Sequence, residues 1–367
     1  MPPDFLLENM QQTLKDHANN QYTMFTGHPL LREKISEFFS PLVKNGNRGN
    51  DLNPNTQVLV TNGALGSINS AIINLVGKGD EVLMFEPYFT QYVNCIEFAG
   101  ASIKTAPMHM KDGCWDFDWE AFEKAITKNT KLVVLTNPHN PSGKLYTREE
   151  IAKLSEILDR HPQVRVISDD VYYFLPFDGR EYVSFADYSP SNFEKTITVY
   201  SAGKMLNCTG WKIGWSVGPP DLIRHAMYVH ESTCFNNNVP GQIAIAKSLP
   251  EAFTQSFNGH KNYLDYTRAT FEESRNVVEK LLARSKNIKF EPIKCESGYF
   301  MAADISSARD MIPERYFRPN VNYEDDKDTI VKQMQFIDNK VPLDFALCRW
   351  LAIEKGVVIM PLSNFCL

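Results

Sequence analysis

The chain has 367 residues, 43% of them hydrophobic and 22% charged, with a formal net charge of -6 at pH 7. Its acidic and basic residues are interspersed, so there is no basic stripe that would attract nucleic acid or an anionic membrane. A chain of this length and composition can bury a large core, and its expected partner is a small molecule.

The seven cysteines never occur in a C-x-x-C spacing, and their odd number argues against a disulfide framework. No apolar run has the length of a membrane span, and Asp4 and Glu8 lie where a signal peptide would need an apolar core. The opening segment is also not rich in arginine. We therefore expect reduced thiols and a cytoplasmic protein, with the mitochondrial matrix as the alternative.

Short β-branched runs alternate with helical stretches from Thr56 to about Gly218. This rhythm predicts an α/β fold, with a large domain in which helices cover both faces of a mostly parallel sheet. The expected strands are TQVLVT (56–61), EVLMFE (81–86), KLVVLT (131–136), VRVISD (164–169), KTITVYS (195–201) and IGWSVG (213–218).

The pattern changes after Gly218, where it is helical through about Lys286, and a second αβ segment begins near Phe290. This change predicts a smaller α/β domain at the C-terminal end. The acidic, proline-containing stretch 311–328 has neither apolar period, so we expect an exposed loop or insertion there.

A possible anion site follows the first expected strand, which ends at Thr61, because Gly63, Ala64 and Leu65 open the next helix. Unpaired N–H groups and the helix dipole at such an N-terminus attract phosphate. The alternative is a plain strand-to-helix turn, since Gly-rich turns are common.

Asp169 ends the expected strand 164–169, and ligands of open α/β sheets usually bind at the carboxyl ends of strands. A carboxylate there can hold a protonated ring nitrogen of a ligand. The alternative is that Asp169 or Asp170 only caps the following turn.

The segment SAGKMLNCTGWKIGW follows the strand 195–201 and contains two lysines. Gly203 permits a tight backbone path, Ser201 can donate to a phosphate, and Lys212 adds a second cation. In these surroundings Lys204 can form a Schiff base with an aldehyde cofactor, whereas a lone lysine would usually be a solvated cation.

This segment resembles the lysine motif of the class I/II aminotransferases that depend on pyridoxal 5'-phosphate (PLP), and the similarity extends from about Pro3 to Phe365. The closest group is that of the kynurenine/glutamine aminotransferases, also called cysteine-S-conjugate β-lyases. In that group a lysine commonly replaces the phosphate-binding arginine, as Lys212 does here. The resemblance implies fold type I, with PLP bound to Lys204.

The resemblance also assigns roles to residues around the cofactor ring. It places Asp169 on the pyridine nitrogen, which keeps that nitrogen protonated, and the Tyr172 phenol on the ring oxygen. The family's N-P-x-G motif matches at Asn140, whose amide would bond the ring oxygen and the substrate carboxylate. Asn-Pro-Ser-Gly is equally a natural turn before a helix near Thr147, and both interpretations can be true.

By position in the family motif, Phe89 would stack on the cofactor ring, although an aromatic side chain there could equally be core. Tyr22 would reach the phosphate in the neighbouring subunit of a homodimer, or else contact only its own chain. On the substrate side, Phe235 and Asn236 match a pair in which relatives often have histidine at the second position. Leu65 stands where an aromatic residue is often found, so a preference for kynurenine stays open.

The expected domains follow from the same resemblance. Residues 1–28 would form an N-terminal segment associated with the small domain and the dimer interface. Residues 29–250 would form the large PLP-binding domain and 251–367 the small C-terminal domain, which looks truncated. The arginine that holds the substrate carboxylate in relatives would come after Leu367, and the family's glycine-containing stretch before Pro-Asp-Phe is missing.

The implied activity is a ping-pong transfer of an amino group from an amino acid to a 2-oxo acid, in which Lys204 acts as leaving nucleophile and general base. Elimination of a β-substituent would give cysteine-S-conjugate β-lyase activity. The alternatives are a truncated, non-catalytic PLP-binding or scaffold subunit and a PLP lyase or synthase. No G-x-G-x-x-G follows a strand and the eight histidines form no metal motif, so a nicotinamide cofactor and a metal are not expected.

Overall fold

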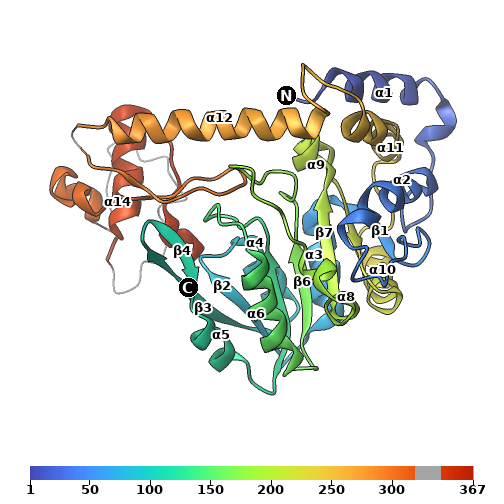
Figure 1. The fold of residues 1–367 in the computed structure, drawn as a ribbon, viewed down its shortest axis with the longest axis horizontal. Helices are drawn as coiled ribbons and strands as arrows, with labels where there is room; N and C mark the ends of the chain where they lie inside the picture. Colours follow the sequence, from blue (N-terminus) through green and yellow to red (C-terminus); the bar gives the residue numbers. More distant parts are fainter. Residues whose placement is uncertain (287, 319–339, 367) are drawn as a thin grey trace.

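An eight-stranded sheet forms the centre of the molecule in the computed structural model, which describes residues 1–286, 288–318 and 340–366 (Figure 1). The strands lie in the order β1-β8-β7-β6-β5-β2-β3-β4. Their bounds are β1 Val58–Asn62, β2 Glu81–Glu86, β3 Ser102–Lys111, β4 Cys114–Phe117, β5 Thr130–Thr136, β6 Arg165–Asp169, β7 Thr196–Ser201 and β8 Ile213–Val217.

The middle of the sheet is parallel, because β7, β6, β5, β2 and β3 run in one direction. β8 is antiparallel to both β1 and β7, and β4 is antiparallel to β3. The prediction of a mostly parallel sheet is confirmed. The sequence pattern did not indicate β3 and β4, because exposed and half-buried residues predominate along this outer hairpin.

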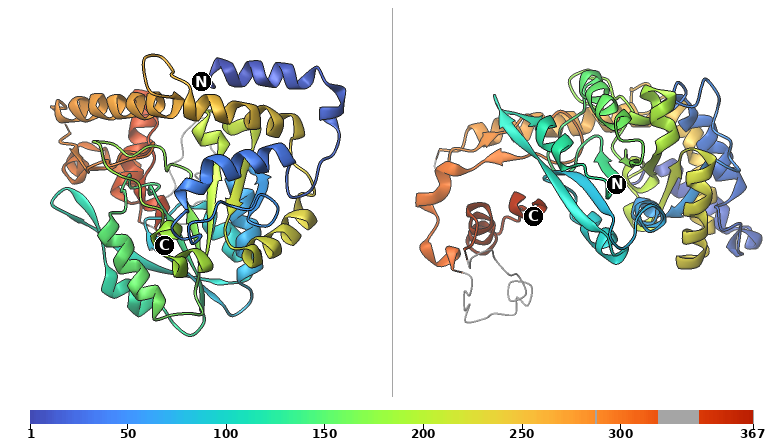
Figure 2. Two further views of the ribbon diagram at one scale, coloured as in Figure 1. Left: turned by 45° about the vertical axis from the view of Figure 1, so that its right-hand side comes forward. Right: turned by 90° about the horizontal axis from the view of Figure 1, so that it is seen from below.

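Helices cover both faces of the sheet (Figures 1 and 2). Successive side chains of a strand point to opposite faces, and in β2 Leu83 packs into one apolar cluster while Val82 and Met84 pack into another. The α-helices up to residue 254 are α1 Asp4–Leu14, α2 Pro29–Phe39, α3 Gly63–Leu75, α4 Gln91–Phe98, α5 Trp119–Ala125, α6 Arg148–Asp159, α7 Phe185–Tyr188, α8 Pro190–Lys195, α9 Ala202–Met205, α10 Pro220–Thr233 and α11 Val239–Thr254.

Helix α6 illustrates how local sequence sets an element's position. Thr147 and Glu150 form a reciprocal capping box, with Thr147 as the N-cap. Ile151 and Leu154 then bury one face of the helix against the sheet. The helix therefore begins where the sequence predicts.

The C-terminal part of the chain begins with the long helix α12 (Tyr263–Ala283), which crosses from the body of the molecule to α14 (Leu343–Trp350) in Figures 1 and 2. A two-stranded sheet follows α12, formed by β9 (Glu291–Pro292) and β10 (Ala303–Asp304). Phe290 and Ile305, which lie next to these strands in the chain, pack against a separate apolar cluster that contains Tyr316.

One prediction for this region is partly wrong. Ile312 and Tyr316 are buried. Ile312 lies between two short 3-10 helices and Tyr316 lies within the second of them, so residues 311–318 are not simply an exposed loop. Two apolar residues four positions apart were too few to reveal a period. The rest of the expected loop, 319–328, lies outside the described residues, and the division into domains stays a prediction.

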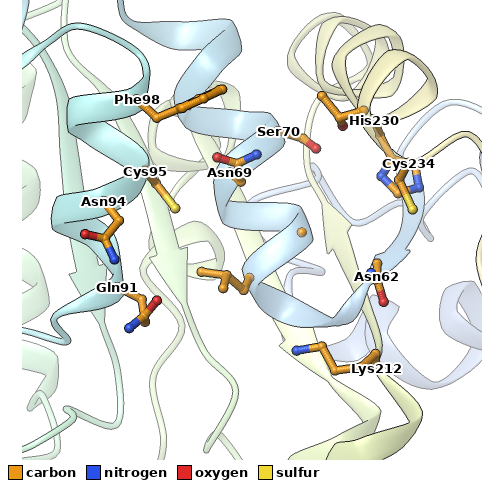
Figure 3. A pocket seen from close by; sticks show the side chains of 13 residues that line it. Asn62, Asn69, Ser70, Gln91, Asn94, Cys95, Phe98, Lys212, His230 and Cys234 are labelled. Atoms are coloured by element: carbon orange, nitrogen blue, oxygen red, sulfur yellow. The ribbon is translucent and has the colours of Figure 1, made fainter. Parts of the chain in front are cut away.

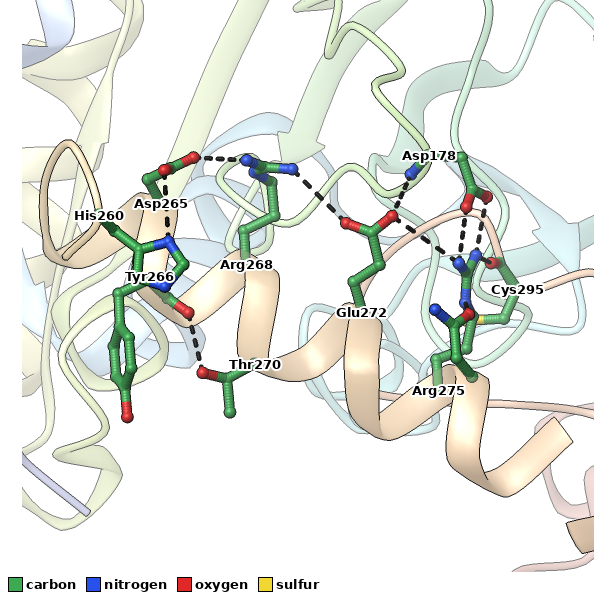
Figure 4. Close-up of polar contacts among 10 residues, drawn as sticks. Asp178, His260, Asp265, Tyr266, Arg268, Thr270, Glu272, Arg275 and Cys295 are labelled. Carbon is green, nitrogen blue, oxygen red and sulfur yellow. Dashed lines mark hydrogen bonds and ion pairs between the residues drawn. The ribbon is translucent and has the colours of Figure 1, made fainter. Parts of the chain in front are cut away.

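Ion pairs attach α12 to the body of the molecule (Figure 4). The Arg275 guanidinium donates to both carboxylate oxygens of Asp178, at 2.6 and 2.8 Å, and to the Cys295 carbonyl oxygen at 2.8 Å. Only 7% of the Arg275 side chain is exposed, so these acceptors satisfy a buried charge. Within the described residues, no helix has the length and apolar character needed to cross a membrane.

Candidate active site

A cavity of about 280 Å³ lies at the carboxyl ends of the parallel strands and beside the first turn of α3. Eleven of the residues singled out from the sequence line it. They are Gly63, Ala64, Leu65, Phe89, Asn140, Asp169, Tyr172, Ser201, Gly203, Lys204 and Lys212. Segments far apart in the chain thus converge where open α/β sheets usually bind ligands.

Lys204 lies on the short helix α9, which Ser201 caps by accepting a 3.3 Å hydrogen bond from the Lys204 N–H. Its Nζ atom is 5.7 Å from the ring centre of Tyr172 and 5.6 Å from that of Tyr299. Burial lowers the pKa of Lys204, the charge of Lys212 lowers it further, and Asp169 opposes both. This shift favours the neutral amine, the form that can act as a nucleophile or base.

Glycine at position 203 allows the short helix α9 to pack closely against the backbone of Thr209. A Cβ atom there would lie only 2.9 Å from the Cα atom of Thr209, a backbone atom that has little freedom to move. The expectation of a tight backbone path at Gly203 agrees with this close approach.

Asp169 is almost completely buried, and one of its carboxylate oxygens is already bonded. Oδ2 accepts a 2.6 Å hydrogen bond from the Tyr92 hydroxyl, which also lies 2.9 Å from Oγ1 of Thr136. Oδ1 has no hydrogen-bond partner among the described residues. Burial raises the pKa of Asp169 to about 6, and the Tyr92 hydrogen bond opposes that rise. A cation in the cavity would satisfy the open oxygen and favour the ionised form.

The next residue, Asp170, has different surroundings. Its carboxylate accepts hydrogen bonds from the hydroxyls of Ser168, at 2.6 Å, and Tyr182. It does not line the cavity, because successive residues at the end of a strand face opposite sides. Burial raises the pKa of Asp170 to about 7. Of the two aspartates, only Asp169 is directed toward a ligand.

Asn140 lies in a turn and also faces the cavity. The segment around it is a turn in which the Gly143 N–H donates to the His139 carbonyl at 2.9 Å. Asn140 also lines the cavity, and its buried Oδ1 has no partner among the described residues. Phe89 is half-buried, lines the cavity and packs edge-on against Tyr92, with ring centres 5.4 Å apart. It is therefore not simply a core residue.

The first turn of α3 faces Lys212. No side chain caps this helix, so its leading N–H groups are available to an anion. Gly63 has φ +70°, and a Cβ atom there would lie 3.4 Å from Cε and Nζ of Lys212. Glycine thus permits the left-handed backbone and leaves room for the lysine, and Lys212 itself has φ 53°.

A second, open cavity of about 480 Å³ adjoins the first and shares Leu65 and Lys212 with it. Figure 3 shows that most of its side chains are polar and come from α3, α4 and α10. The labelled residues are Asn62, Asn69, Ser70, Gln91, Asn94, Cys95, Phe98, Lys212, His230 and Cys234.

Three predicted residues lie away from the Lys204 cavity of their own chain. The rings of Tyr22 and Phe235 meet edge-on at 5.5 Å, and both are exposed, Tyr22 by 82%. Asn236 donates a 2.8 Å hydrogen bond to the Thr23 carbonyl oxygen. None of the three lines the cavity, so within one chain they are not brought together with Lys204.

Sequence reasoning missed three residues that shape the cavity. Tyr92 bonds Asp169, Tyr299 donates a 2.7 Å hydrogen bond to the Lys204 carbonyl oxygen, and Phe300 lines the wall. Tyr92 closes the FEPYFTQY segment, so its place next to Phe89 was the available signal. Tyr299 and Phe300 lie in a distant segment, and no local pattern connects them with Lys204.

The residues present fit PLP. Lys204 offers an amine, and Lys212, Ser201 and the first turn of α3 offer a cation and donors to a phosphate. Asp169 has a buried oxygen without a partner, which suits a protonated ring nitrogen. Within the described residues, no group of three or more histidine, cysteine, aspartate or glutamate side chains is arranged to hold a metal.

Comparisons with known proteins agree on one family. The sequence model of the family described as Aminotransferase class I and II matches residues 1–367. The kynurenine–oxoglutarate transaminase of Dictyostelium discoideum is 32% identical over 378 residues, covering 99% of this chain and 80% of the relative.

Two solved structures are also similar. One is the N-succinyldiaminopimelate aminotransferase of Mycobacterium tuberculosis, with TM-score 0.83, 28% identity and coverage of 100% of this chain and 82% of that one. The other is YbdL of Escherichia coli, which has a methionine aminotransferase function, with TM-score 0.81, 27% identity and coverage of 100% and 83%. The chain belongs to the family of class I and II aminotransferases, which use PLP.

Proposed function

We propose that this aminotransferase is a kynurenine–oxoglutarate transaminase whose reaction takes place in the Lys204 cavity. The observation that carries the proposal is the convergence of Lys204, the open oxygen of Asp169 and the cation of Lys212 in one cavity. The family membership supports the transfer of an amino group between amino acids and 2-oxo acids, and the similarity to the Dictyostelium discoideum enzyme supports the choice of substrates.

The chain's own residues have separate tasks in this proposal. When bound, PLP supplies an aldehyde for the amino group and a ring that accepts electrons from the substrate α-carbon. Lys204 would hold the cofactor and would also move a proton from the substrate α-carbon, a task that its lowered pKa favours. Asp169 keeps the ring nitrogen protonated, and Lys212 and Ser201 hold the phosphate.

Asn140 and Tyr172 orient the bound molecules. The Asn140 amide would hold the ring oxygen and the substrate carboxylate, and the Tyr172 phenol would also donate to the ring oxygen. Phe89 covers the ring and keeps water from it. A substrate with a leaving group on its β-carbon would undergo elimination from the same arrangement, so we include cysteine-S-conjugate β-lyase activity as a side reaction.

The choice of kynurenine also follows from the chemistry of the cavity wall. Leu65 and Phe300 are apolar, and Tyr299 adds a half-buried aromatic ring close by. A donor with an aromatic side chain can bury its ring against such residues. The acceptor in the second half of a ping-pong cycle is 2-oxoglutarate.

We also propose that the protein is a homodimer with shared active sites. We assign to the interface a surface that includes five exposed large apolar side chains: Phe98, which lines the second cavity, together with Tyr22, Met24, Tyr228 and Phe235. A second copy that covers this surface would bury them and bring its own Tyr22 to the phosphate near Lys212. Phe235 and Asn236 would likewise contact the substrate of the neighbouring subunit.

The location of the protein in the cell is a further part of the proposal. All seven cysteines are free, and none is paired in a disulfide. We place the protein in the cytoplasm, where thiols stay reduced, and the mitochondrial matrix would meet the same condition.

The test is the visible absorption spectrum of the purified chain with PLP, before and after the addition of kynurenine or glutamine. A yellow band that converts to the pyridoxamine form shows half-transamination, and its recovery with 2-oxoglutarate completes the cycle. A band that never responds would favour a non-catalytic PLP-binding subunit. No band at all would contradict the role of Lys204.

A further inference from the structure

Tyr299 lies beside Lys204, although 95 residues separate them in the chain. Its hydroxyl donates a 2.7 Å hydrogen bond to the backbone carbonyl oxygen of Lys204. Its ring centre is 5.6 Å from the Nζ atom of the same lysine, with the ring of Tyr172 at 5.7 Å. One tyrosine therefore contacts both the backbone and the reactive end of Lys204.

The Lys204 carbonyl needs such a donor because α9 ends at Met205, one residue later. Carbonyl groups in the last turn of a helix have no partner within the helix. The following N–H groups are directed elsewhere, since Leu206 donates to the Ala202 carbonyl at 2.8 Å and Cys208 to the Gly203 carbonyl at 3.0 Å. The Tyr299 hydroxyl thus fixes the orientation of the peptide group that carries Lys204.

Tyr299 is itself held on two sides. Its ring stacks on Phe271 of α12, with centres 4.4 Å apart and planes at 19°, and it meets Tyr172 edge-on at 5.0 Å. Immediately before it, the Gly298 N–H donates to the Leu175 carbonyl at 3.2 Å. The position of Tyr299 therefore depends on α12 and on the segment that contains Tyr172.

We propose that Tyr299 is a positioning residue for Lys204 in the transamination, with its hydroxyl fixing the lysine backbone and its ring, supported by Phe271, confining the amine. This inference rests on the proposed role of Lys204. The charged groups that act on the amine are Asp169 and Lys212, and neither replaces the contact from the tyrosine. Position matters here because a displacement of about 1 Å can cost about 100-fold in rate.

The first test compares two holoenzyme variants. Tyr299→Phe keeps the stacked ring and removes only the hydroxyl, and we expect kcat to fall about 10-fold while KM stays within about 2-fold. Tyr263→Phe is the matched control, because it removes another buried hydroxyl, one that accepts a 2.9 Å hydrogen bond from Asn207 but does not contact Lys204. Equal kcat values in Tyr299→Phe and the parent would overturn the proposal.

The second test does not need the cofactor. Competitive labelling of the full chain with acetic anhydride at a series of pH values, read by mass spectrometry of the Lys204 peptide, reports the titration of this amine. Burial lowers the pKa of Lys204, so a loosened lysine in Tyr299→Phe should label with a midpoint shifted upward, toward that of an exposed lysine. An unchanged midpoint would contradict the proposal.

Two further outcomes have a defined meaning. If the parent forms no visible band with PLP, the proposed function fails, but the labelling experiment still tests whether Tyr299 confines Lys204. If Tyr299→Phe does not fold by circular dichroism, Phe271→Leu replaces it, because that variant removes the support of the Tyr299 ring from outside the cavity. The same upward shift of the midpoint is expected, and its absence would overturn the inference.

Discussion

The Tyr92 hydroxyl donates a 2.6 Å hydrogen bond to Oδ2 of Asp169, which leaves Oδ1 as the carboxylate oxygen open to the cavity. A carboxylate held in this way keeps one orientation toward its ligand. Tyr92 is itself fixed by Thr136, whose Oγ1 lies 2.9 Å from the same hydroxyl. The chain thus places a buried hydrogen-bond network behind the Asp169 carboxylate, which lines the cavity.

Removing the hydrogen bond from Tyr92 to Asp169 should weaken the binding of the cofactor. In Tyr92→Phe, Asp169 loses a donor to its ionised form, so its pKa should rise further above about 6. We expect the affinity for PLP and kcat each to fall about 10-fold, since loss of such a supporting contact typically costs 10 to 100-fold. Equilibrium dialysis and steady-state kinetics measure both. Tyr146→Phe is the control, because that buried hydroxyl has no hydrogen-bond partner among the described residues.

Lys204→Ala should abolish transamination, because the variant loses both the nucleophile that holds the cofactor and the base that moves the proton. We expect a loss of at least about 10³-fold in turnover, measured with kynurenine and 2-oxoglutarate. Lys204→Arg keeps a cation at the position but cannot supply a neutral amine, so it should be equally inactive. Substantial turnover by either variant would exclude the mechanism.

Asp170 should make stability depend on pH in a defined direction. Its pKa is raised to about 7 in the folded chain, so the folded state binds the proton more tightly than the unfolded state. Stability from this group is therefore full below the unfolded pKa of about 4 and is lost as pH rises through about 7. Asp170→Asn cannot ionise, so it does not lose this stability. The melting temperature of the variant minus that of the parent should therefore rise by a few degrees between about pH 5 and pH 8.

The matched control for this comparison is Asp221→Asn, because the Asp221 side chain is 89% exposed on α10. Its melting temperature relative to the parent should not change with pH in the same range. If the difference in melting temperature between Asp170→Asn and the parent stays constant with pH, Asp170 is already ionised in the folded chain at pH 5.

Asp178→Ala should destabilise the chain, because the Arg275 guanidinium would keep the Cys295 carbonyl and a longer 3.9 Å ion pair with Glu272 but would lose both of its hydrogen bonds to Asp178. Hydrogen bonds to a buried charge are worth more than surface ion pairs, so we expect the free energy of unfolding to fall by about 1–3 kcal/mol in urea titrations. Glu314→Ala breaks the exposed pair with Arg309 and should cost less than about 1 kcal/mol. Equal effects of the two substitutions would contradict this account of α12.

Mixing two inactive variants tests whether the active site is shared. If Tyr22 serves the neighbouring subunit, a heterodimer of Lys204→Ala and Tyr22→Ala contains one site with both residues intact. Random exchange of subunits makes half of the dimers hybrid, so activity should return to about a quarter of the parent value. Recovery would be absent if Tyr22 acted only within its own chain, and sedimentation velocity checks that both variants remain dimeric.

Much of the cavity was predictable because its residues end strands or begin helices, positions that local sequence determines. Asp169 closes a β-branched run, Gly63 opens a helix, and Lys204 follows a strand within a specific motif. The order of such segments along a parallel sheet brings their carboxyl ends to one edge. The central strands were also predictable from local sequence, because their apolar runs are continuous.

The contacts that were missed depend on long-range packing. Tyr299 reaches Lys204 only because α12 and the segment after it fold back over the cavity, and no period in the sequence encodes that path. The outer strands β3 and β4 were missed because an exposed hairpin needs no continuous apolar run. Tyr22 and Phe235 were predicted as site residues from resemblance, and the roles that we propose for them need a second chain.

The two consecutive aspartates at the end of β6, Asp169 and Asp170, face different surroundings, one with an oxygen open to the cavity and one bonded to two hydroxyls. Because side chains alternate along a strand, a shift of one residue in the pairing of β6 with β7 would exchange them. Substitutions within β6 that keep its apolar character can therefore be tolerated over evolution. Insertion or deletion of a single residue would instead direct Asp169 away from the cavity and place Asp170 there. Selection at this edge of the sheet should act on the length of the strand more strongly than on its composition.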